Sequence, residues 1–397
     1  MSGPSPDRQY IAALTGLRGV AAGLVFLYHY SALHPGIRLD LTVPLLGPVL
    51  QFPLGFGFAG VDIFFVLSGF LLTLPFARHA LATGRDGGGP SLPRYFRRRF
   101  LRVFPAYYAQ LLILLLAGAW FVSWKPQTAA TLAGHLLMYF NIGLGGLGPV
   151  KPMVGVWWTL PVEMGFYLLL PLLAPFLRPA RWLPLMLAGI AASVAYRAWA
   201  AAHFGPLGDD HAFLAASQLP GSLPEFLLGA SAALVAQYVA ARDLRRPPAW
   251  LLDLAFAAGL VLPAAWLWQV VLGAGADYWQ GHWSMLIAPL AVGLPLSVAV
   301  LSLCWGSRIG TWLLANRVVY FLGLVSYSLY LWHFVAMQQL QQVIGDGYGQ
   351  LSHWITFPLS TAAALLAATA SYYLVERPFY RLKPWRQAKR EESQAGE

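Results

Sequence analysis

Charged residues are scarce in this chain. Asp, Glu, Lys and Arg together make up 11% of its 397 residues, whereas a soluble globular protein carries about 25%. Apolar residues make up 58%. This composition excludes a soluble multidomain protein and predicts a single polytopic membrane domain.

Cysteine is almost absent. The only one, Cys304, lies in an apolar run, so there is no disulfide framework and the redox compartment is not indicated. The opening residues, MSGPSPDRQY, lack the basic region and cleavage site of a removed signal peptide, and we expect the first helix to remain in the mature protein. Repeats of fixed period are also missing, as is an inverted pair of interrupted helices typical of many secondary transporters.

What the chain does contain is a series of apolar stretches, each about 20 residues long, the length that crosses a bilayer. We predict an all-α fold with ten transmembrane helices, at residues 11–31, 53–77, 103–122, 156–177, 182–203, 223–241, 249–271, 283–305, 318–340 and 353–375. The segment 128–143 is shorter and more mixed, and both a re-entrant helix and an eleventh span remain open. Residues 1–9 and 382–397 are predicted to be polar tails flanking a membrane domain at 10–381.

Positive charge is distributed unevenly along these spans. Of the 26 Lys and Arg, 21 fall in alternate connections and in the C-terminal tail, three (Arg38, Lys125 and Lys151) fall on the opposite side, and two (Arg18 and Arg197) fall within spans. The positive-inside rule therefore predicts that both termini are cytoplasmic. The net charge of +10 reflects this topology, and we expect no nucleic-acid partner.

The first predicted span carries two ionisable residues, Arg18 and His29. A helix rises about 1.5 Å per residue, which separates them by about 16 Å, half of a hydrocarbon core. Ionisable residues inside a span are candidates for function by default. The alternatives are that Arg18 snorkels to the lipid headgroups and that His29 is a packed or interfacial residue.

The second span contains Asp62, Ser68 and Gly69. We expect Asp62 on the same side of the membrane as His29, where its carboxylate could fix the tautomer of the imidazole. A helix cap following Gly60 fits Asp62 equally well. The small pair of Ser68 and Gly69 permits close helix approach, so packing is its default interpretation.

The fourth span contains Glu163, a few residues after Trp157 and Trp158. If these tryptophans mark the outer interface, Glu163 lies at the depth of His29. A carboxylate there needs a partner or a function, and we expect that partner to be His29 or Arg18.

Two further groups of ionisable residues lie near the C-terminus. His333 is in the ninth span, and Glu376 and Arg377 are at the inner end of the tenth. We interpret these three residues as structural anchors.

A dense basic run leads into the third span, comprising Arg94, Arg97, Arg98, Arg99 and Arg102. Arg99 and Arg102 are three residues apart, so they share a helical face and could clamp a phosphate. A nucleotide-bearing thioester would suit this cluster. Contact with anionic lipid is the competing interpretation.

Six sequence motifs occur in a recognisable order: LRG with a histidine after ten further residues, GVDIFFVLSGFLL, RRRFLRVFP, WTLPVEMGFYLLLP, SYSLYLWH and VERPFYR. With these motifs the chain resembles the acyltransferase-3 family of integral membrane O-acyltransferases, from about Tyr10 to Arg381. Members of that family move acyl groups, often acetyl from acetyl-CoA, to hydroxyls of extracytoplasmic glycans, lipid-linked sugars or small molecules such as macrolides. Some carry an appended soluble hydrolase-like domain, which we do not find in this sequence, so it resembles the stand-alone members.

The resemblance implies roles for particular residues. The family's arginine–histidine pattern falls on Arg18 and His29, its arginine pair on Arg99 and Arg102, and its glutamate on Glu163. We therefore expect His29 to act as general base, oriented by Glu163 or Asp62, with Arg18 on the donor side. A covalent acyl-histidine intermediate remains open. The residues expected to bind the donor are Arg98, Arg99, Arg102 and Ser68.

These expectations describe a membrane O-acyltransferase in the bacterial inner membrane. Acetyl-CoA or another acyl-CoA is the expected donor, a carbohydrate or small-molecule hydroxyl is the expected acceptor, and no metal is expected. A proton-coupled transporter or flippase is the rival interpretation. The motifs, the basic cluster and the missing repeat symmetry disfavour it.

Overall fold

The computed structural model describes residues 6–34, 42–43, 47–48, 55–83, 91–117, 129–138, 154–207 and 211–380. In these residues the fold is helical, as predicted, apart from a two-residue antiparallel pairing of β1 (Thr42–Val43) with β2 (Gly47–Pro48). The longer helices are α1 (Pro6–Leu33), α3 (Gly60–Thr83), α4 (Leu92–Leu116), α6 (Thr159–Leu173), α7 (Pro179–Phe204), α9 (Leu219–Ala241), α10 (Ala249–Ala274), α11 (Trp283–Trp305), α14 (Ser326–Ile344) and α15 (His353–Ser371). The shorter ones are α5 (Ala129–Leu137), α8 (His211–Ala216), α12 (Arg308–Leu314), α13 (Arg317–Leu324) and α16 (Arg377–Tyr380), and the turns that matter below are η1 (Gly57–Ala59), η2 (Gly155–Trp158) and η5 (Gly275–Gln280).

Nine helices in the described ranges are long and apolar enough to cross a membrane, and the bent pair α13 and α14 brings the number to ten. Large apolar side chains on the outside of the bundle are strongly exposed, for example Leu116 at 78%, Leu374 at 77% and Trp354 at 87%. Contiguous apolar surface of this kind suits lipid rather than water. The chain is an integral membrane protein.

The ninth span is not the continuous helix that we predicted for 318–340. It is broken at Val325 into α13 and α14, which meet at an angle of 75°. Gly323 faces α1 so closely that a Cβ there would lie 1.9 Å from the Thr15 carbonyl oxygen. The break lets α13 lie against α1 near this contact while α14 turns to pack along α15.

The third span begins earlier than predicted. Helix α4 starts at Leu92 instead of residue 103, so the whole basic run is helical and continues directly into the apolar part. Helix α5 has nine residues, about 13.5 Å, and cannot cross a core of about 30 Å. The rest of the segment predicted at 128–143, from residue 139 on, lies outside the described residues, as does the tail at 382–397.

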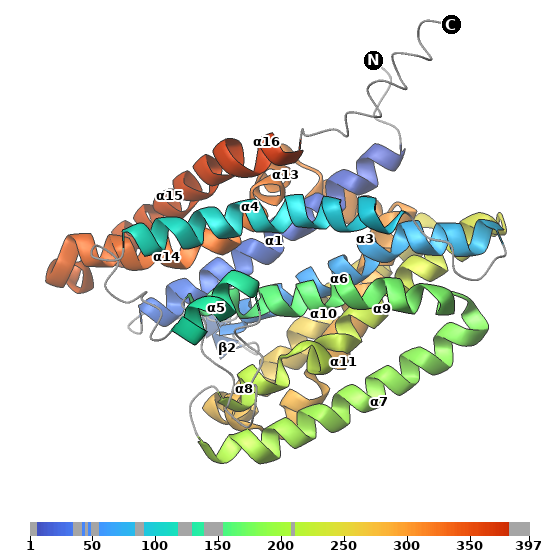
Figure 1. Ribbon diagram of the computed structural model, residues 1–397, viewed down its shortest axis with the longest axis horizontal. Coiled ribbons are helices and arrows are strands. Elements are labelled where there is room, and N and C mark those ends of the chain that lie inside the picture. The colour runs from blue at the N-terminus through green and yellow to red at the C-terminus, as the bar shows by residue number, and fades with distance from the viewer. Residues whose placement is uncertain are drawn as a thin grey trace, which may run out of the picture.

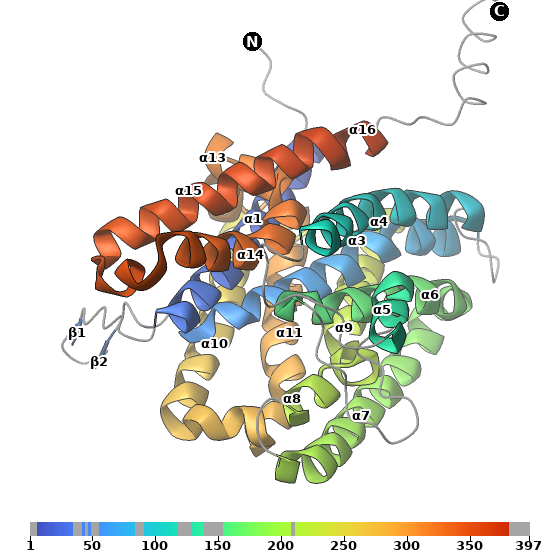
Figure 2. The same ribbon diagram turned by 60° about the vertical axis from the view of Figure 1, so that its left-hand side comes forward.

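Helices α1 and α3 lie in the interior of the bundle, between α14 and α15 on one side and α9 to α11 on the other (Figures 1 and 2). Helix α3 packs closely along α9. A Cβ on Gly69 would lie 2.2 Å from the Phe226 carbonyl oxygen, and one on Gly229 would lie 2.1 Å from that of Val66. The small residue at position 69 therefore serves helix packing, as predicted.

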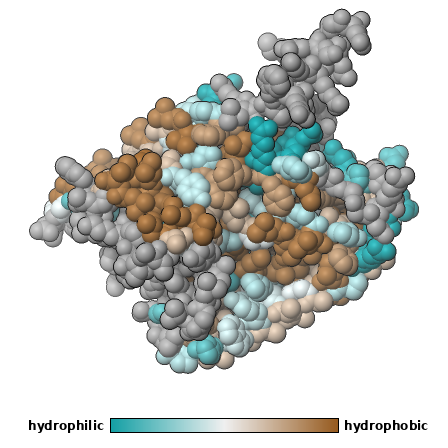
Figure 3. Space-filling model, viewed as in Figure 1, coloured by the Kyte–Doolittle hydropathy of each residue, from teal (hydrophilic) through white to brown (hydrophobic). Residues whose placement is uncertain are grey.

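The first turns of α1 and the short α16 lie on the same side of the bundle (Figures 1 and 2). An even number of crossings requires this arrangement. Figure 3 shows apolar surface over the middle of the helices and hydrophilic surface toward the end where α16 and the start of α4 lie. The arginine-rich start of α4 is therefore at a polar end of the bundle.

Candidate functional site

Two cavities meet in the centre of the bundle. One, which we call the arginine cavity, has a volume of about 130 Å³ and is lined by α1, α3, α4, α6 and α14. Its polar wall consists of Arg18, Ser68, Arg99, Arg102, Thr159, Glu163, Tyr167, Tyr327 and Tyr330. The other, which we call the histidine cavity, has a volume of about 340 Å³, and its polar wall includes His29, Asp62, Arg197, Ser217, Ser222 and Glu225.

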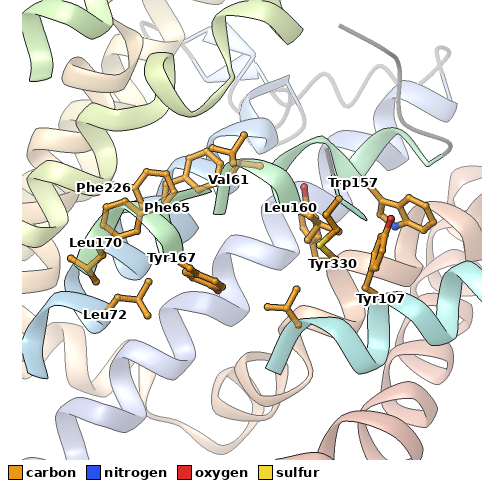
Figure 4. Close-up of a cluster of buried hydrophobic side chains, with 14 of the residues drawn as sticks. Val61, Phe65, Leu72, Tyr107, Trp157, Leu160, Tyr167, Leu170, Phe226 and Tyr330 are labelled. Carbon is orange, nitrogen blue, oxygen red and sulfur yellow. The ribbon is translucent and has the colours of Figure 1, made fainter. Parts of the chain in front are cut away.

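A thin wall separates the two cavities. Val61, Phe65 and Tyr330 line both of them. Phe65 stacks on Phe226 with ring centroids 4.7 Å apart, and Figure 4 shows Val61 beside this pair. The Tyr330 hydroxyl donates to the Val156 carbonyl oxygen over 2.6 Å. The wall is ordered by these contacts but is only one side chain thick.

The arginines of α4 form two groups, those that line the arginine cavity and those that do not. Arg99 and Arg102 line the arginine cavity, whereas Arg94, Arg97 and Arg98 are exposed and do not. The reason is helical periodicity, because residues three apart share a face and adjacent residues do not. Of the three arginines expected to bind the donor, Arg98 is therefore the one that lies away from the cavity.

Arg99 has an unsatisfied donor at this cavity. Its Nε is buried, and no hydrogen-bond acceptor for it is found among the described residues. Its guanidinium lies 6.0 Å from the centre of the Tyr167 ring. A buried donor without a partner is costly, and an anionic ligand in the cavity would relieve that cost.

Glu163 does not pair with His29. Ser68 Oγ donates to Glu163 Oε1 over 3.0 Å, and the Tyr167 hydroxyl donates to the same oxygen. Ser68 is six residues beyond Asp62 on α3, about 9 Å along the helix axis. Of the two partners predicted for Glu163, His29 is therefore not the one that it bonds, whereas Arg18 lines the same cavity.

The partner of His29 is a second histidine. His29 Nδ1 lies 2.9 Å from the Val25 carbonyl oxygen and 3.2 Å from His333 Nε2. His333 Nδ1 in turn lies 2.9 Å from the Leu329 carbonyl oxygen. Sequence reasoning treated His333 as an anchor, although an ionisable residue in an apolar span was a signal for a functional one.

Asp62 reaches the histidine cavity with His29 but is paired elsewhere. Its carboxyl group forms a hydrogen bond with that of Glu225, and Arg197 is close enough to interact electrostatically with both. Arg197 donates to the carbonyl oxygens of Met285, at 2.8 Å, and Ala216, at 3.1 Å. A hydrogen bond between two carboxyl groups requires a shared proton.

Glu225 and Arg197 were not singled out from the sequence, although both fall within predicted spans. Glu225 is 3% exposed and Arg197 4% exposed. The second carboxyl oxygen of Glu225 is buried without a hydrogen-bond partner in the described part of the chain. As it lies on the cavity wall, a bound hydroxyl could donate to it.

Aromatic rings cover much of the histidine cavity. They come from α1, η1, η2, α8 and η5, and comprise Tyr28, Phe58, Trp158, Phe213, Tyr278 and Trp279. Phe213 and Trp279 make an edge-to-face contact with centroids 4.7 Å apart. The short segments α8 and η5 thus each supply part of this wall.

No metal site accompanies these cavities in the described ranges, where no group of three or more His, Cys, Asp or Glu side chains is arranged to hold an ion. An imidazole lies on one side of the wall and three arginines lie on the other.

Comparison with known proteins gives a consistent family match. The model of a family described as "Acyltransferase domain" matches residues 11–375. No solved structure matches the chain significantly.

Three relatives illustrate the match. The peptidoglycan O-acetyltransferase OatA of Listeria monocytogenes is 28% identical over 181 residues, covering 42% of this chain and 24% of that protein. Nodulation protein 10 of Rhizobium leguminosarum bv. viciae is 27% identical over 388 residues, covering 91% of each. The acyltransferase MdmB of Streptomyces mycarofaciens is 26% identical over 402 residues, covering 94% of this chain and 92% of that protein.

Proposed function

The chain belongs to the family defined by the acyltransferase domain, and on that premise we propose that it transfers an acyl group, in the simplest case acetyl, from cytosolic acyl-CoA to a hydroxyl of an extracytoplasmic or membrane-associated acceptor. It is an acyltransferase of the class that moves groups other than aminoacyl groups. The observation that carries the proposal is the pair of cavities. Three arginines lie on one side of a thin wall and a histidine lies on the other.

The arginine cavity suits the donor. Arg99 and Arg102 offer charge-assisted hydrogen bonds to phosphate oxygens, and the unsatisfied Nε of Arg99 is one such donor. A cavity of about 130 Å³ cannot hold a whole acyl-CoA but can receive the acyl thioester end of its pantetheine arm. The nucleotide part of acyl-CoA would therefore stay at the cytoplasmic mouth while the thioester reaches toward Val61 and Tyr330.

His29 suits the role of general base. It takes the proton from the acceptor hydroxyl while that oxygen attacks the thioester carbonyl carbon. The C–S bond then breaks, and the thiolate of CoA receives the proton from the imidazolium. Atoms and charges balance as acyl-CoA plus alcohol giving ester plus CoA, so no metal or further cofactor is needed. A covalent acyl-histidine route would give the same products.

Glu163 serves the donor side in this scheme. Its carboxylate is held by Ser68 and Tyr167 and interacts electrostatically with Arg99. It therefore helps to hold the positive groups of the arginine cavity in place. Arg18, on the same wall, is placed to stabilise negative charge on the donor.

The histidine cavity suits a hydroxyl-rich acceptor. Its aromatic walls can pack on the apolar faces of a sugar ring, and Asp62 and Glu225 supply acceptors for hydroxyl donors. We therefore favour a glycan or a lipid-linked sugar over a small molecule. With both termini cytoplasmic, as the charge distribution predicts, the protein would act in a bacterial inner membrane with this cavity facing outward.

The test uses the purified protein in lipid nanodiscs with radiolabelled acetyl-CoA and a series of longer acyl-CoA donors. We expect release of free CoA that rises when an acceptor extract is added. In the His29→Ala variant release should fall to background while acyl-CoA still binds, because the arginine cavity is intact. If no donor gives CoA-dependent turnover, or if the variant keeps the wild-type rate, the proposal is wrong and transport becomes the better explanation.

A further inference from the structure

His29, on the wall of the histidine cavity, contacts a second histidine, His333. We propose that His333 is a positioning residue: together with the Val25 carbonyl oxygen it accepts the hydrogen on His29 Nδ1 and fixes the ring, so that Nε2 is the atom that accepts the proton of the acceptor hydroxyl. This inference rests on the proposed role of His29 as general base. It goes further by naming the atom and the two groups that leave it free.

The protonation of His333 follows from its hydrogen bonds. A backbone carbonyl oxygen can only accept, so the 2.9 Å contact between His333 Nδ1 and the Leu329 oxygen requires hydrogen on Nδ1. A neutral imidazole carries one hydrogen, which leaves His333 Nε2 with a lone pair. His333 is fully buried, and no carboxylate is found within hydrogen-bond distance of it in the described residues, so nothing there would stabilise a second proton.

The protonation of His29 follows in the same way. Its Nδ1 faces two acceptors, the Val25 carbonyl oxygen at 2.9 Å and the lone pair of His333 Nε2 at 3.2 Å. A hydrogen on Nδ1 satisfies both, as a shared donor. A lone pair on Nδ1 would instead face two other lone pairs, so the alternative tautomer is disfavoured.

Packing fixes the two rings in this arrangement. Their centroids are 5.1 Å apart, and Phe334 contacts the His29 ring edge-on at 5.2 Å. His333 also packs against Phe26 and Tyr330. Nδ1 of His29 thus makes its hydrogen bonds within the protein. Nε2 has no hydrogen-bond partner in the described part of the chain, and the residue lies on the cavity wall.

The bend in the ninth span contributes to this geometry. Helix α13 lies against the start of α1 near Thr15, and after the 75° turn α14 approaches α1 again near His29. The contact joins residues 304 positions apart in the sequence. The broken span therefore brings a second histidine to Nδ1 of His29.

Two amide substitutions separate the positioning role from a structural one. In His333→Gln the amide oxygen can take the place of Nε2 and accept from His29. In His333→Asn the shorter amide overlaps the Nδ1 position, keeps the bond to Leu329 and leaves His29 without that acceptor. Both variants keep a polar group of similar size, so thermal stability of the purified proteins should be alike.

The first readout is the rate of acyl transfer. We expect His333→Gln to stay within a few-fold of the wild type and His333→Asn to lose about 10- to 100-fold in kcat, the range seen when partners that orient a metal-bound imidazole are removed. The KM for acyl-CoA should not change in either variant. Equal rates in the two variants, with equal stability, would overturn the inference.

The second readout does not depend on activity. Solution or solid-state NMR of protein labelled with ¹⁵N in its histidines reports which ring nitrogen of His29 carries hydrogen, and the His29→Gln variant identifies the signal. We expect the Nδ1–H form in the wild type and in both variants, because the Val25 carbonyl oxygen accepts from Nδ1 in each, and a shifted or broadened His29 signal only in His333→Asn, where the second acceptor is missing. An Nε2–H form in the wild type would overturn the inference even in an active enzyme, whereas the Nδ1–H form in a protein without acyltransferase activity would count against the proposed function alone.

Discussion

Replacing Arg98 or Arg99 removes one positive charge in either case, so comparing the two variants tests the donor site without a difference in net charge. Arg99 lines the arginine cavity and has a buried Nε without a partner, whereas Arg98 is exposed on another face of α4. We therefore compare Arg99→Gln with Arg98→Gln. Each removes one positive charge from the same turn of the same helix, so only the position relative to the cavity differs.

The expected size of the effect follows from the lost bond. A hydrogen bond to a charged group contributes about 1.5–3 kcal/mol, which corresponds to a change of about 10- to 150-fold in binding. Removing Arg99 should raise the KM or Kd for acyl-CoA by an amount in this range. Removing Arg98 takes away only a solvent-screened charge, and the expected change is about threefold or less, as for an exposed ion pair.

The assay is a titration of acyl-CoA at two ionic strengths, read as CoA release and, independently, as binding of a non-hydrolysable acyl-CoA analogue. We expect the Arg99→Gln defect to persist at high salt and the small Arg98→Gln defect to shrink. If both variants weaken binding equally, and salt removes both effects, then α4 attracts the donor only through its net charge and the assignment of the arginine cavity is refuted.

Two further predictions concern the packing and the wall between the cavities. Gly69→Ala should destabilise the protein by about 1–3 kcal/mol or more, since a Cβ there would meet the Phe226 backbone at 2.2 Å. Gly23→Ala is the control and should be neutral or slightly stabilising, because a Cβ there has nothing within 4 Å. Thermal unfolding in detergent compares the two variants, and equal melting temperatures would contradict the packing argument. Val61→Trp should block the passage at the wall shared by the cavities and abolish acyl transfer, while acyl-CoA still binds. Val61→Ile serves as the control. A Val61→Trp enzyme with normal turnover would show that the donor arm takes another path.

The fold was largely predictable because membrane spans depend on length and apolar composition. The ten predicted spans correspond to nine helices and one bent pair in the described residues. The bend at Val325 was not predictable, since it accompanies the approach of Gly323 to Thr15, a contact between residues far apart in sequence. Helix α4 starts at Leu92, before the predicted span, because the span was placed from apolar composition alone, whereas arginines are good helix formers.

The site was predictable in its residue types but not in all of its pairings. The depth of Glu163 was inferred from two neighbouring tryptophans, but depth alone did not show that Glu163 accepts from Ser68 and Tyr167. A sequence gives the position of a residue along its own helix and not the neighbour that it faces. For the same reason His333 was assigned to anchoring and Glu225 was not singled out.

The central claim is that this protein esterifies a hydroxyl outside the cytoplasm with an acyl group carried across the thin wall between the two cavities. The most direct measurement compares, by mass spectrometry, the glycans and lipids of the parent strain, a deletion strain, and deletion strains that express the wild-type protein or His29→Ala at equal levels. The account predicts an acyl ester that is present in the parent, lost on deletion, restored by the wild-type protein and not restored by His29→Ala. Restoration by His29→Ala, or an ester pattern that does not change on deletion, would contradict it.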